Sequence, residues 1–383
     1  MKTKITARFV LKAAIFAVLV LLSVLLGLNL CAPTEANESD ASTMLNLVPE
    51  ATVLPTPAAQ TAPAIEKTPE PDVISVAKDM PLIETPAPKT VTIAGEQEKM
   101  PDYSFYYFTD TQHYSKKYPQ TFYTMTEWMC DHIEEYNVQY AFFTGDFIHN
   151  RDDKDQWVVA KNAMAQLEEK LPVFAIAGNH DVGGEGPDYT TYSKHFGPEH
   201  YKNNGHIVDW FENGKGRADT FTIGDTKYLF AGIGWGAGDE GIKWLSKILD
   251  EYKDHKAILF FHDYIKTEGV FSDTGSKHYK NLVKKHENVF MVLCGHRYNC
   301  MMFTTEHDDD GDNLTDRKVY HIMMNYQAFE NGGDGYLAVI RVYEDDHMIM
   351  FDTYSPTLDK WYHFEDQSLL NKEKLRMPVK IFS

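Results

Sequence analysis

The chain of 383 residues carries 37 Lys and Arg against 56 Asp and Glu, so its formal net charge is -19. Hydrophobic residues make up 43% and aromatic residues 13%, which suffices for a large core and excludes a wholly disordered chain. The negative charge disfavours stable nucleic-acid binding through a basic face. Four cysteines are too few for a disulfide framework.

The N-terminus has the pattern of an export signal. Lysines and an arginine precede an apolar run from Ala13 to Leu30, which predicts a signal peptide or signal anchor over residues 1–31. Cleavage after Ala36, retention as a membrane anchor and lipidation of Cys31 all stay open. In each case the basic flank predicts that the rest of the chain is extracellular or at the cell surface. We expect contact with the membrane only through this segment.

Residues 32–101 differ in composition from the rest of the chain. Eleven of the 17 prolines lie here, among Thr, Ala and Glu. No apolar periodicity is present, so the segment predicts a disordered linker, functioning as a stalk or as a passive spacer.

From Asp102 onward, strand and helix patterns alternate, which predicts an α/β (α+β) domain over residues 102–383. The first six β segments are expected at Tyr103–Phe108, Val138–Thr144, Pro172–Ala177, Phe221–Ile233, Ala257–Phe261 and Val289–Leu293. Helices are expected over Tyr118–Tyr136, Asp153–Lys170 and Gly241–Tyr252. Strands then follow one another at Met301–Thr305, Val319–Asn325, Tyr336–Val342 and Met348–Tyr354.

Polar side chains with oxygen or nitrogen donors follow five of these strands. They are Asp110, Asp146, Asn179-His180, His262 and His296. Because the carboxyl ends of strands in open α/β sheets form the ligand crevice, we expect these residues to converge. Such donors suit two divalent ions bridged by one carboxylate, an arrangement that promotes displacement at phosphorus.

These strand-end motifs resemble the motif series of the calcineurin-like metallophosphoesterases. The matching strings are Asp110-Thr111-Gln112, Gly145-Asp146, Gly178-Asn179-His180-Asp181, His262 and Gly295-His296. The resemblance runs from about Tyr103 to Tyr298 and implies a four-layer sandwich of two mixed β-sheets flanked by helices. Asp-Thr-Gln also resembles an exported bacterial subgroup, as does the later Tyr326-Gln327.

The resemblance implies a role for each motif residue. Asp146 would bridge two metal ions, with Asp110 and Gln112 at the first ion and Asn179, His262 and His296 at the second. His180 would be the general acid or the electrostatic partner of the leaving oxygen, and Asp181 would orient it. The cofactors implied are two divalent ions, Zn, Mn or Fe.

The chain departs from the common family pattern at the first ion. Gln112 stands where a histidine is usual, and Tyr298 stands where Gly-His-x-His would place its second histidine. A neutral amide oxygen is a weaker ligand than imidazole, so this site should be looser. Tyr298, His149 and His113 are three candidates to compensate, and a role outside the ligand set stays open for each.

Other motifs favour plainer interpretations. Gly232–Gly238 fits no nucleotide-binding spacing and predicts a rim loop. Glu306–Asn313 resembles a calcium loop, but Asn313 stands where a loop that starts at Asp308 needs Gly, and no Glu closes it. The segment therefore predicts a solvated hairpin. Cys130, Cys294 and Cys300 are expected to be free thiols, with a bond between Cys294 and Cys300 as the alternative. No Gly-x-Ser-x-Gly elbow is present.

The sequence therefore predicts an exported hydrolase that cleaves a phosphomonoester or phosphodiester by a dimetal-activated hydroxide. A phosphorylated small molecule, a lipid headgroup and a wall polymer all stay open as substrates. The alternative is a weakly active or non-catalytic surface-binding protein on the same fold. An extracellular nuclease fits poorly with the charge of -19.

Overall fold

A computed structural model describes residues 90–380 of the chain. The predicted signal segment 1–31 and residues 32–89 of the predicted linker lie outside this range. Among the residues described, no helix combines the length and apolar character needed to cross a membrane.

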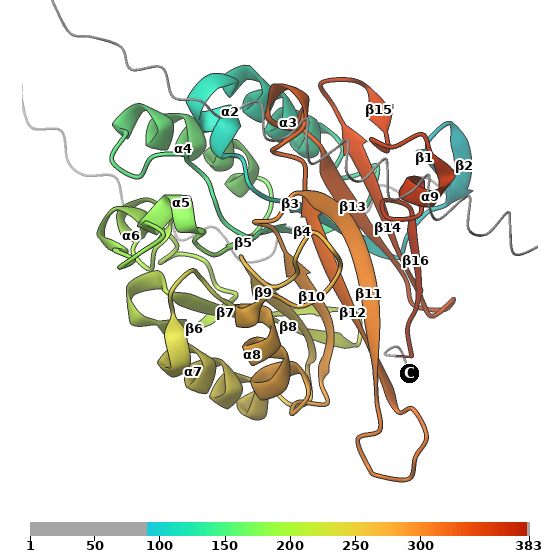
Figure 1. Cartoon of the computed structure of the whole chain (residues 1–383). Helices are drawn as coiled ribbons and strands as arrows, with labels where there is room; N and C mark the ends of the chain where they lie inside the picture. The colour runs from blue at the N-terminus through green and yellow to red at the C-terminus, as the bar shows by residue number, and fades with distance from the viewer. Residues whose placement is uncertain (1–89, 381–383) are drawn as a thin grey trace, which may run out of the picture. The chain divides into compact units, whose positions relative to one another are not determined.

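Two seven-stranded mixed sheets make up the centre of the domain (Figure 1). The first has the order β15-β14-β13-β3-β4-β5, with β16 paired to β14. Its strands are β3 (Tyr103–Phe108), β4 (Val138–Phe143), β5 (Val173–Ala175), β13 (Leu337–Tyr343), β14 (Met348–Ser355), β15 (Lys360–Trp361) and β16 (Leu375–Pro378). Strands β3, β4 and β5 run parallel, and the others pair antiparallel.

The second sheet has the order β11-β12-β10-β9-β8-β7-β6. Its strands are β6 (Ile207–Phe211), β7 (Gly216–Ile223), β8 (Thr226–Ile233), β9 (Lys256–Phe261), β10 (Val289–Cys294), β11 (Asn299–His307) and β12 (Arg317–Asn325). Strands β8, β9, β10 and β12 run parallel.

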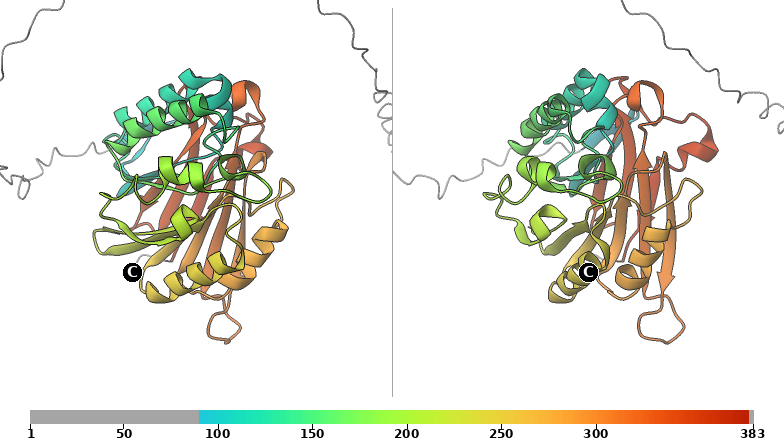
Figure 2. Two further views of the ribbon diagram at one scale, coloured as in Figure 1. Left: turned by 90° about the vertical axis from the view of Figure 1, so that its left-hand side faces the viewer. Right: turned by 60° about the vertical axis from the view of Figure 1, so that its left-hand side comes forward.

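Helices cover the outer face of each sheet, and Figure 2 shows them on both sides. The helices are α2 (Gln112–Lys117), α3 (Pro119–Asp131), α4 (Lys154–Glu168), α5 (Asn179–Val182), α6 (Thr190–Phe196), α7 (Gly238–Glu251), α8 (Asp273–His278) and α9 (Gln367–Leu370). Three apolar clusters separate the layers: one between the first sheet and α3, α4 and α6, one between the sheets, and one between the second sheet and α7. The predicted four-layer sandwich is confirmed.

Strand β3 shows how the sequence produces these layers. All six of its side chains are buried. Because successive side chains point to opposite faces of a strand, Phe105 and Tyr107 enter the cluster between the sheets, whereas Tyr106 and Phe108 pack against the helices. A strand covered on both faces therefore has a continuous aromatic run rather than an alternating one.

Most predicted elements are present with bounds shifted by a few residues. The β segment Phe221–Ile233 is in fact part of two strands, β7 and β8, which form a hairpin. The predicted hairpin around Glu306–Asn313 is confirmed by the antiparallel pairing of β11 with β12. Short helices α2, α5, α6 and α8 were not predicted, because each has fewer than eight residues and too few turns to show a period.

The predicted linker extends too far at its C-terminal end. Residues 90–99 form a hairpin of β1 (Thr90–Ile93) and β2 (Glu96–Lys99). Val91 and Ile93 are 2% and 1% exposed and join the cluster under the helices. The turn residues Ala94 and Gly95 both have positive φ, as a two-residue hairpin turn requires. The short alternation Thr-Val-Thr-Ile was the signal, and the surrounding prolines obscured it.

Candidate metal centre

The side chains that follow the parallel strands converge at one edge of the sandwich. Asp110, Asp146 and Asn179 follow β3, β4 and β5 of the first sheet. His262 and His296 follow β9 and β10 of the second sheet. Parallel neighbours end at the same edge, which is why residues up to 186 positions apart meet here.

The tightest group contains Asp146, His262 and His296, whose donor atoms lie within 4.8 Å of one another. His262 Nε2 lies 3.3 Å from Asp146 Oδ2 and 3.0 Å from Asn179 Oδ1. His262 Nδ1 lies 2.8 Å from the carbonyl oxygen of Thr144, which accepts a hydrogen bond from the Nδ1–H group. When the ring is neutral, the lone pair of Nε2 faces the oxygens of Asp146 and Asn179, which also carry lone pairs. A cation between these three atoms would be bound by all of them. This donor set fits a divalent metal ion.

The charges of the cluster favour a cation at its centre. Burial lowers the pKa of His262, but Asp146 and Asp110 outweigh burial and raise it to about 10. Burial, together with the charge of Asp146, raises the pKa of Asp110 to about 7. Burial and the neighbouring His262 lower the pKa of His296 to about 3. The carboxylates thus stabilise a positive charge at His262, whereas burial and His262 oppose one at His296.

Asp110 anchors a second group of donors beside the first. Its Oδ2 accepts the His296 backbone N–H at 3.0 Å and the Thr109 hydroxyl at 2.7 Å. Gln327 Nε2 donates to Asp110 Oδ1 at 3.2 Å. Gln112, at the start of α2, places its amide Nε2 3.3 Å from Asp146 Oδ2. The structure therefore brings Gln112 next to Asp146, and Gln327 next to Asp110.

Backbone geometry after the strands is unusual. Asp110, Asp146 and His296 have φ of 54°, 62° and 66°, a region that residues with a side chain rarely occupy. A Cβ on Gly178 would collide with the Asp146 carboxylate, and one on Gly295 would collide with the Asp110 carboxylate. These two glycines allow the loops to approach the carboxylates closely.

His180 is fixed at the margin of the cluster. Its backbone N–H donates to Asp146 Oδ1 at 2.8 Å, and its ring Nδ1 lies 2.8 Å from the carbonyl oxygen of His149. The His180 ring stacks on His149 at 4.9 Å between centroids, and His149 stacks on His113 at 5.6 Å. With Nδ1 donating to a carbonyl, Nε2 is the atom left for a reacting group.

Asp181 does not orient the ring of His180, so this part of the prediction is wrong. The buried Asp181 carboxylate accepts the backbone N–H groups of Asp146, Phe147 and Gly178, each at 2.8 Å, and that of Ile148 at 3.3 Å. Burial and the nearby Asp146 raise its pKa to about 8. The two oxygens of the Asp181 carboxylate accept all four backbone N–H groups from the loops around it. Asp181 therefore holds the loop that carries Asp146.

Tyr298, His149 and His113, the three residues predicted to compensate for the missing histidine, do not occupy equivalent positions. Tyr298 is 55% exposed, unlike the buried donors. His149 and His113 form the stack on His180, and His149 Nδ1 is buried without a hydrogen-bond partner. Gln327, which the sequence suggested only as part of a subgroup motif and not as a donor, lies at this position instead. Its signal was a further strand, β12, ending in the polar Asn325-Tyr326-Gln327.

A cavity of about 440 Å³ opens beside His262. Residues 233–238 of the Gly-rich segment line it, which agrees with the predicted rim loop, although Gly232 and Ile233 still belong to β8. Within this loop the Trp235 ring lies 5.2 Å from that of His296, and its Nε1 donates to the Gly184 carbonyl at 2.9 Å. Trp235 thus forms an aromatic wall next to the candidate metal ligands. Cys130, Cys294 and Cys300 are free thiols, as predicted.

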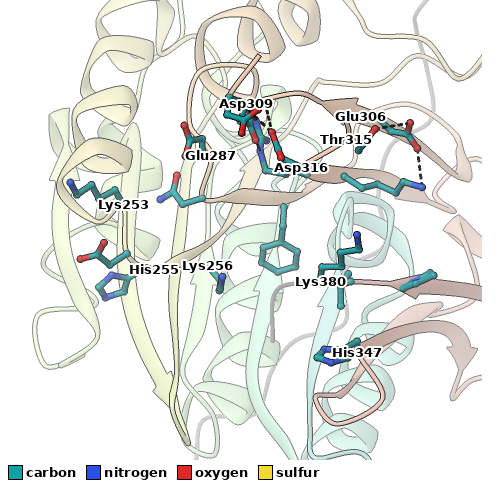
Figure 3. Close-up of a pocket in the computed structure, with 18 of the residues that line it drawn as sticks. Lys253, His255, Lys256, Glu287, Glu306, Asp309, Thr315, Asp316, His347 and Lys380 are labelled. Atoms are coloured by element: carbon teal, nitrogen blue, oxygen red, sulfur yellow. Dashed lines mark hydrogen bonds and ion pairs between the residues drawn. The ribbon is translucent and has the colours of Figure 1, made fainter. Parts of the chain in front are cut away.

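A larger cavity, about 1030 Å³, lies at the other end of β9, around Lys256 (Figure 3). Two ion pairs lie among its lining residues: Arg317 binds Asp309 at 2.8 Å and Lys318 binds Glu306 at 3.1 Å. At the β11–β12 tip, Asp308 and Asp316 accept backbone N–H groups of their own loop. This cavity is therefore separate from the strand-end donors.

Comparison with known proteins supplies a family for this arrangement. A family profile described as calcineurin-like phosphoesterase matches residues 103–300. The uncharacterized protein YvnB of Bacillus subtilis is 34% identical over 278 residues, which cover 72% of this chain and 22% of YvnB. A probable glycerophosphodiester phosphodiesterase, GpdQ, of Arcobacter nitrofigilis is 24% identical over 172 residues, covering 41% of this chain and 55% of GpdQ.

The chain thus spans 22% and 55% of the length of these two relatives. Among solved structures, the purple acid phosphatase PPD1 of yellow lupin is 14% identical with a TM-score of 0.46, covering 69% of this chain and 54% of PPD1. GAP50, the anchor in the inner membrane complex of Plasmodium, is 13% identical with the same TM-score, covering 73% of this chain and 89% of GAP50.

Proposed function

This chain belongs to the calcineurin-like phosphoesterase family, and from that premise we propose that it hydrolyses phosphate esters with two divalent cations held at the strand ends. One observation carries the proposal. Asp146 Oδ2 lies 3.3 Å from His262 Nε2 on one side and 3.3 Å from the Gln112 amide on the other. A carboxylate that faces two donor groups at once is placed to bridge two ions.

The two ions would occupy adjacent donor sets. Asn179, His262, His296 and Asp146 would hold one, and Asp110, Gln112 and Asp146 would hold the other. When bound, such a pair supplies Lewis-acid chemistry that activates water and neutralises charge on phosphoryl oxygens. The metals proposed are Zn, Mn or Fe, whose affinities for carboxylate, amide and imidazole donors suit these sets.

The protein's own contribution to catalysis comes from His180. Its Nδ1 is held by the His149 carbonyl, so the ring has one orientation and presents Nε2 at the margin of the cluster. In the protonated form Nε2 would give its proton to the leaving oxygen, and the resulting alcohol would depart. The stack on His149 holds the ring plane, while Asp181 holds the loop beneath.

The cavity and the predicted export support a proposal for the substrate class. The cavity beside His262, bounded by the Trp235 ring, has room for the alcohol part of a phosphate ester in addition to the phosphate group. A phosphorylated small molecule, a lipid headgroup and a wall polymer are the substrates proposed, encountered outside the cytoplasm. The name of the Arcobacter relative supports testing glycerophosphodiesters among them.

The second candidate function is a surface-binding protein with an impaired first site. Gln112 in place of imidazole and the exposed Tyr298 favour it. This candidate predicts at most one tightly bound ion and no turnover, so metal content and hydrolysis together separate the two.

The test combines elemental analysis with a chromogenic substrate panel. Protein produced with Zn, Mn and Fe supplied should contain close to two ions per chain and hydrolyse aryl phosphate monoesters or diesters. Chelator should remove one ion more readily than the other and abolish turnover. Protein that contains two ions and cleaves neither ester class, or that contains no transition metal, would reject the proposal.

A further inference from the structure

Gln327 reaches the donor cluster because β12 lies parallel to β10. The two strands pair in the register Cys294↔Met323, so their carboxyl ends meet at the same edge as His296. After β12, the Asn325 side chain accepts the Gln327 backbone N–H at 2.9 Å and turns the chain toward Asp110. The Gln327 side chain is 9% exposed. Its position is therefore set by the sheet rather than by a surface loop.

Two amides connect the two carboxylates in this part of the cluster. Gln327 Nε2 lies 3.2 Å from Asp110 Oδ1, and Gln112 Nε2 lies 3.3 Å from Asp146 Oδ2. The Gln327 Oε1 and Gln112 Nε2 atoms are in close contact with each other. Gln112 Oε1 is buried and has no hydrogen-bond partner. One buried oxygen donor is therefore unused when the amides point their nitrogens at the carboxylates.

Rotating both amides by half a turn moves the Gln112 oxygen into contact with Gln327 and places the Gln112 amide nitrogen in the buried position without a partner. The hydrogen bond between the glutamines is kept with donor and acceptor exchanged, because amide oxygen and nitrogen occupy equivalent positions. Each amide oxygen then faces a carboxylate oxygen, which is favourable only with a cation between them. The separations of 3.2 and 3.3 Å match the spacing of about 3.0–3.4 Å between adjacent ligand oxygens of an octahedral ion with bonds of about 2.1–2.4 Å.

We propose that Gln112 and Gln327 together complete the first cation site, and that its all-oxygen donor set selects a hard cation such as Mn²⁺ over Zn²⁺. Carboxylate and carbonyl oxygens suit Mg²⁺, Ca²⁺ and Mn²⁺, whereas imidazole suits Zn²⁺ and Fe. The second set has two imidazoles, His262 and His296, and takes the softer ion. The two sites therefore prefer different metals.

This inference rests on the proposed function only in taking two cations at the cluster, and binding measurements test it apart from turnover. Metal-free protein is first loaded with one equivalent of Zn²⁺ and then titrated with Mn²⁺, followed by the electron paramagnetic resonance signal of free Mn²⁺ and by calorimetry. The wild type should bind one Mn²⁺ beside one Zn²⁺ per chain. Binding of Zn²⁺ at both sites with Mn²⁺ excluded would overturn the proposal.

The variants assign the effect to Gln327. Gln327→Ala should weaken Mn²⁺ binding on the order of 10–100-fold and leave the affinity for the first equivalent of Zn²⁺ unchanged. Gln327→Glu keeps an oxygen donor and should bind Mn²⁺ at least as tightly as the wild type. The double variant Gln112→His and Gln327→His should reverse the preference toward Zn²⁺.

Gln139→Ala is the matched control, because the side chain of Gln139, which lies on β4, hydrogen-bonds only with Asn137. It should bind Mn²⁺ like the wild type. Should Gln327→Ala fold poorly, Gln327→Glu and the double variant still decide the matter. Unchanged metal preference in the double variant overturns the inference even if the enzyme hydrolyses phosphate esters. Selective binding without hydrolysis overturns the proposed function and leaves the inference standing.

Discussion

Asp110, Asp146 and His296 have left-handed backbone conformations that cost roughly 1–3 kcal/mol each for residues with side chains. Hydrogen bonds from neighbouring loops hold them there. Asp146 is clamped through its backbone N–H by Asp181, and its carboxylate accepts the His180 N–H. The orientation of the bridging carboxylate therefore depends on a residue that would touch neither ion.

Asp181→Asn should weaken the loop that carries Asp146. An amide presents an N–H group to backbone donors that need an acceptor, so we expect the free energy of unfolding to fall by roughly 2–4 kcal/mol. Metal affinity should fall on the order of 10–100-fold, because Asp146 loses its fixed position. Urea unfolding and metal titration measure the two effects. Full metal binding with reduced kcat would instead restore the predicted role at His180.

His180→Ala should act in the opposite way. The ring donates to the His149 carbonyl and is not among the three residues whose donor atoms converge. We expect kcat to fall roughly 10²–10⁴-fold, the range of general acid catalysis, with two ions retained. Steady-state kinetics with elemental analysis measures this. His255→Ala, in the loop before β9, is the control and should keep both properties; loss of metal in His180→Ala would contradict the assignment.

Strands and their ends were the most predictable parts of the chain. The aromatic runs at β3 and β4 give the buried strands, and each candidate donor follows its strand directly, so strand assignment and site assignment are the same inference. A predicted strand also precedes Gln327, but its contact with Asp110, like the stack of His113, His149 and His180, could not be predicted this way. Both depend on which strands are neighbours in the sheet, and no local pattern in one sequence encodes that order.

Two buried histidines make the second sheet sensitive to acid. His278 at the end of α8 stacks on Phe261, with ring centroids 4.3 Å apart, and His321 lies in β12. Burial lowers the pKa of each to about 3. Below the ordinary value of about 6.5, the unfolded chain takes up protons that the folded chain excludes, so stability falls as pH decreases toward 3.

His278→Leu should remove its share of this acid sensitivity. Between pH 7 and pH 5 one such histidine accounts for roughly 2 kcal/mol of lost stability. The difference in unfolding free energy between those pH values, measured by urea titration of metal-free protein, should therefore shrink by about that amount in the variant. Measurement at pH 8, where both rings are neutral, isolates the packing change. Equal pH dependence in the two proteins would show that His278 is protonated in the fold.

The domain as a unit begins earlier than its composition indicates. The β1–β2 hairpin adds Val91 and Ile93 to the core under the helices. On its other strand, Glu98 binds the buried Arg341 at 2.7 Å, and Arg341 in turn binds Asp352 at 2.7 Å. These contacts tie residues 90–99 to the centre of the first sheet.

Ile93→Ala tests this boundary. A buried side chain that leaves a cavity costs about 2–5 kcal/mol when truncated to alanine, so we expect a loss near the lower end at this peripheral position. The exposed Thr90 on the same strand supplies the control, since Thr90→Ala removes no core contact. Chemical denaturation of both variants compares them. Equal stability would return residues 90–101 to the linker.

The candidate donors are divided between the two sheets, with Asp110, Asp146 and Asn179 after strands of one and His262 and His296 after strands of the other. Bound cations would therefore cross-link the two sheets at this contact, here called the seam, through residues that are distant in sequence. The seam exists only once both sheets have formed, so ions captured there act late in folding. Metal should consequently leave the refolding rate nearly unchanged and slow unfolding in proportion to the binding free energy, giving the domain a long lifetime wherever cations are plentiful.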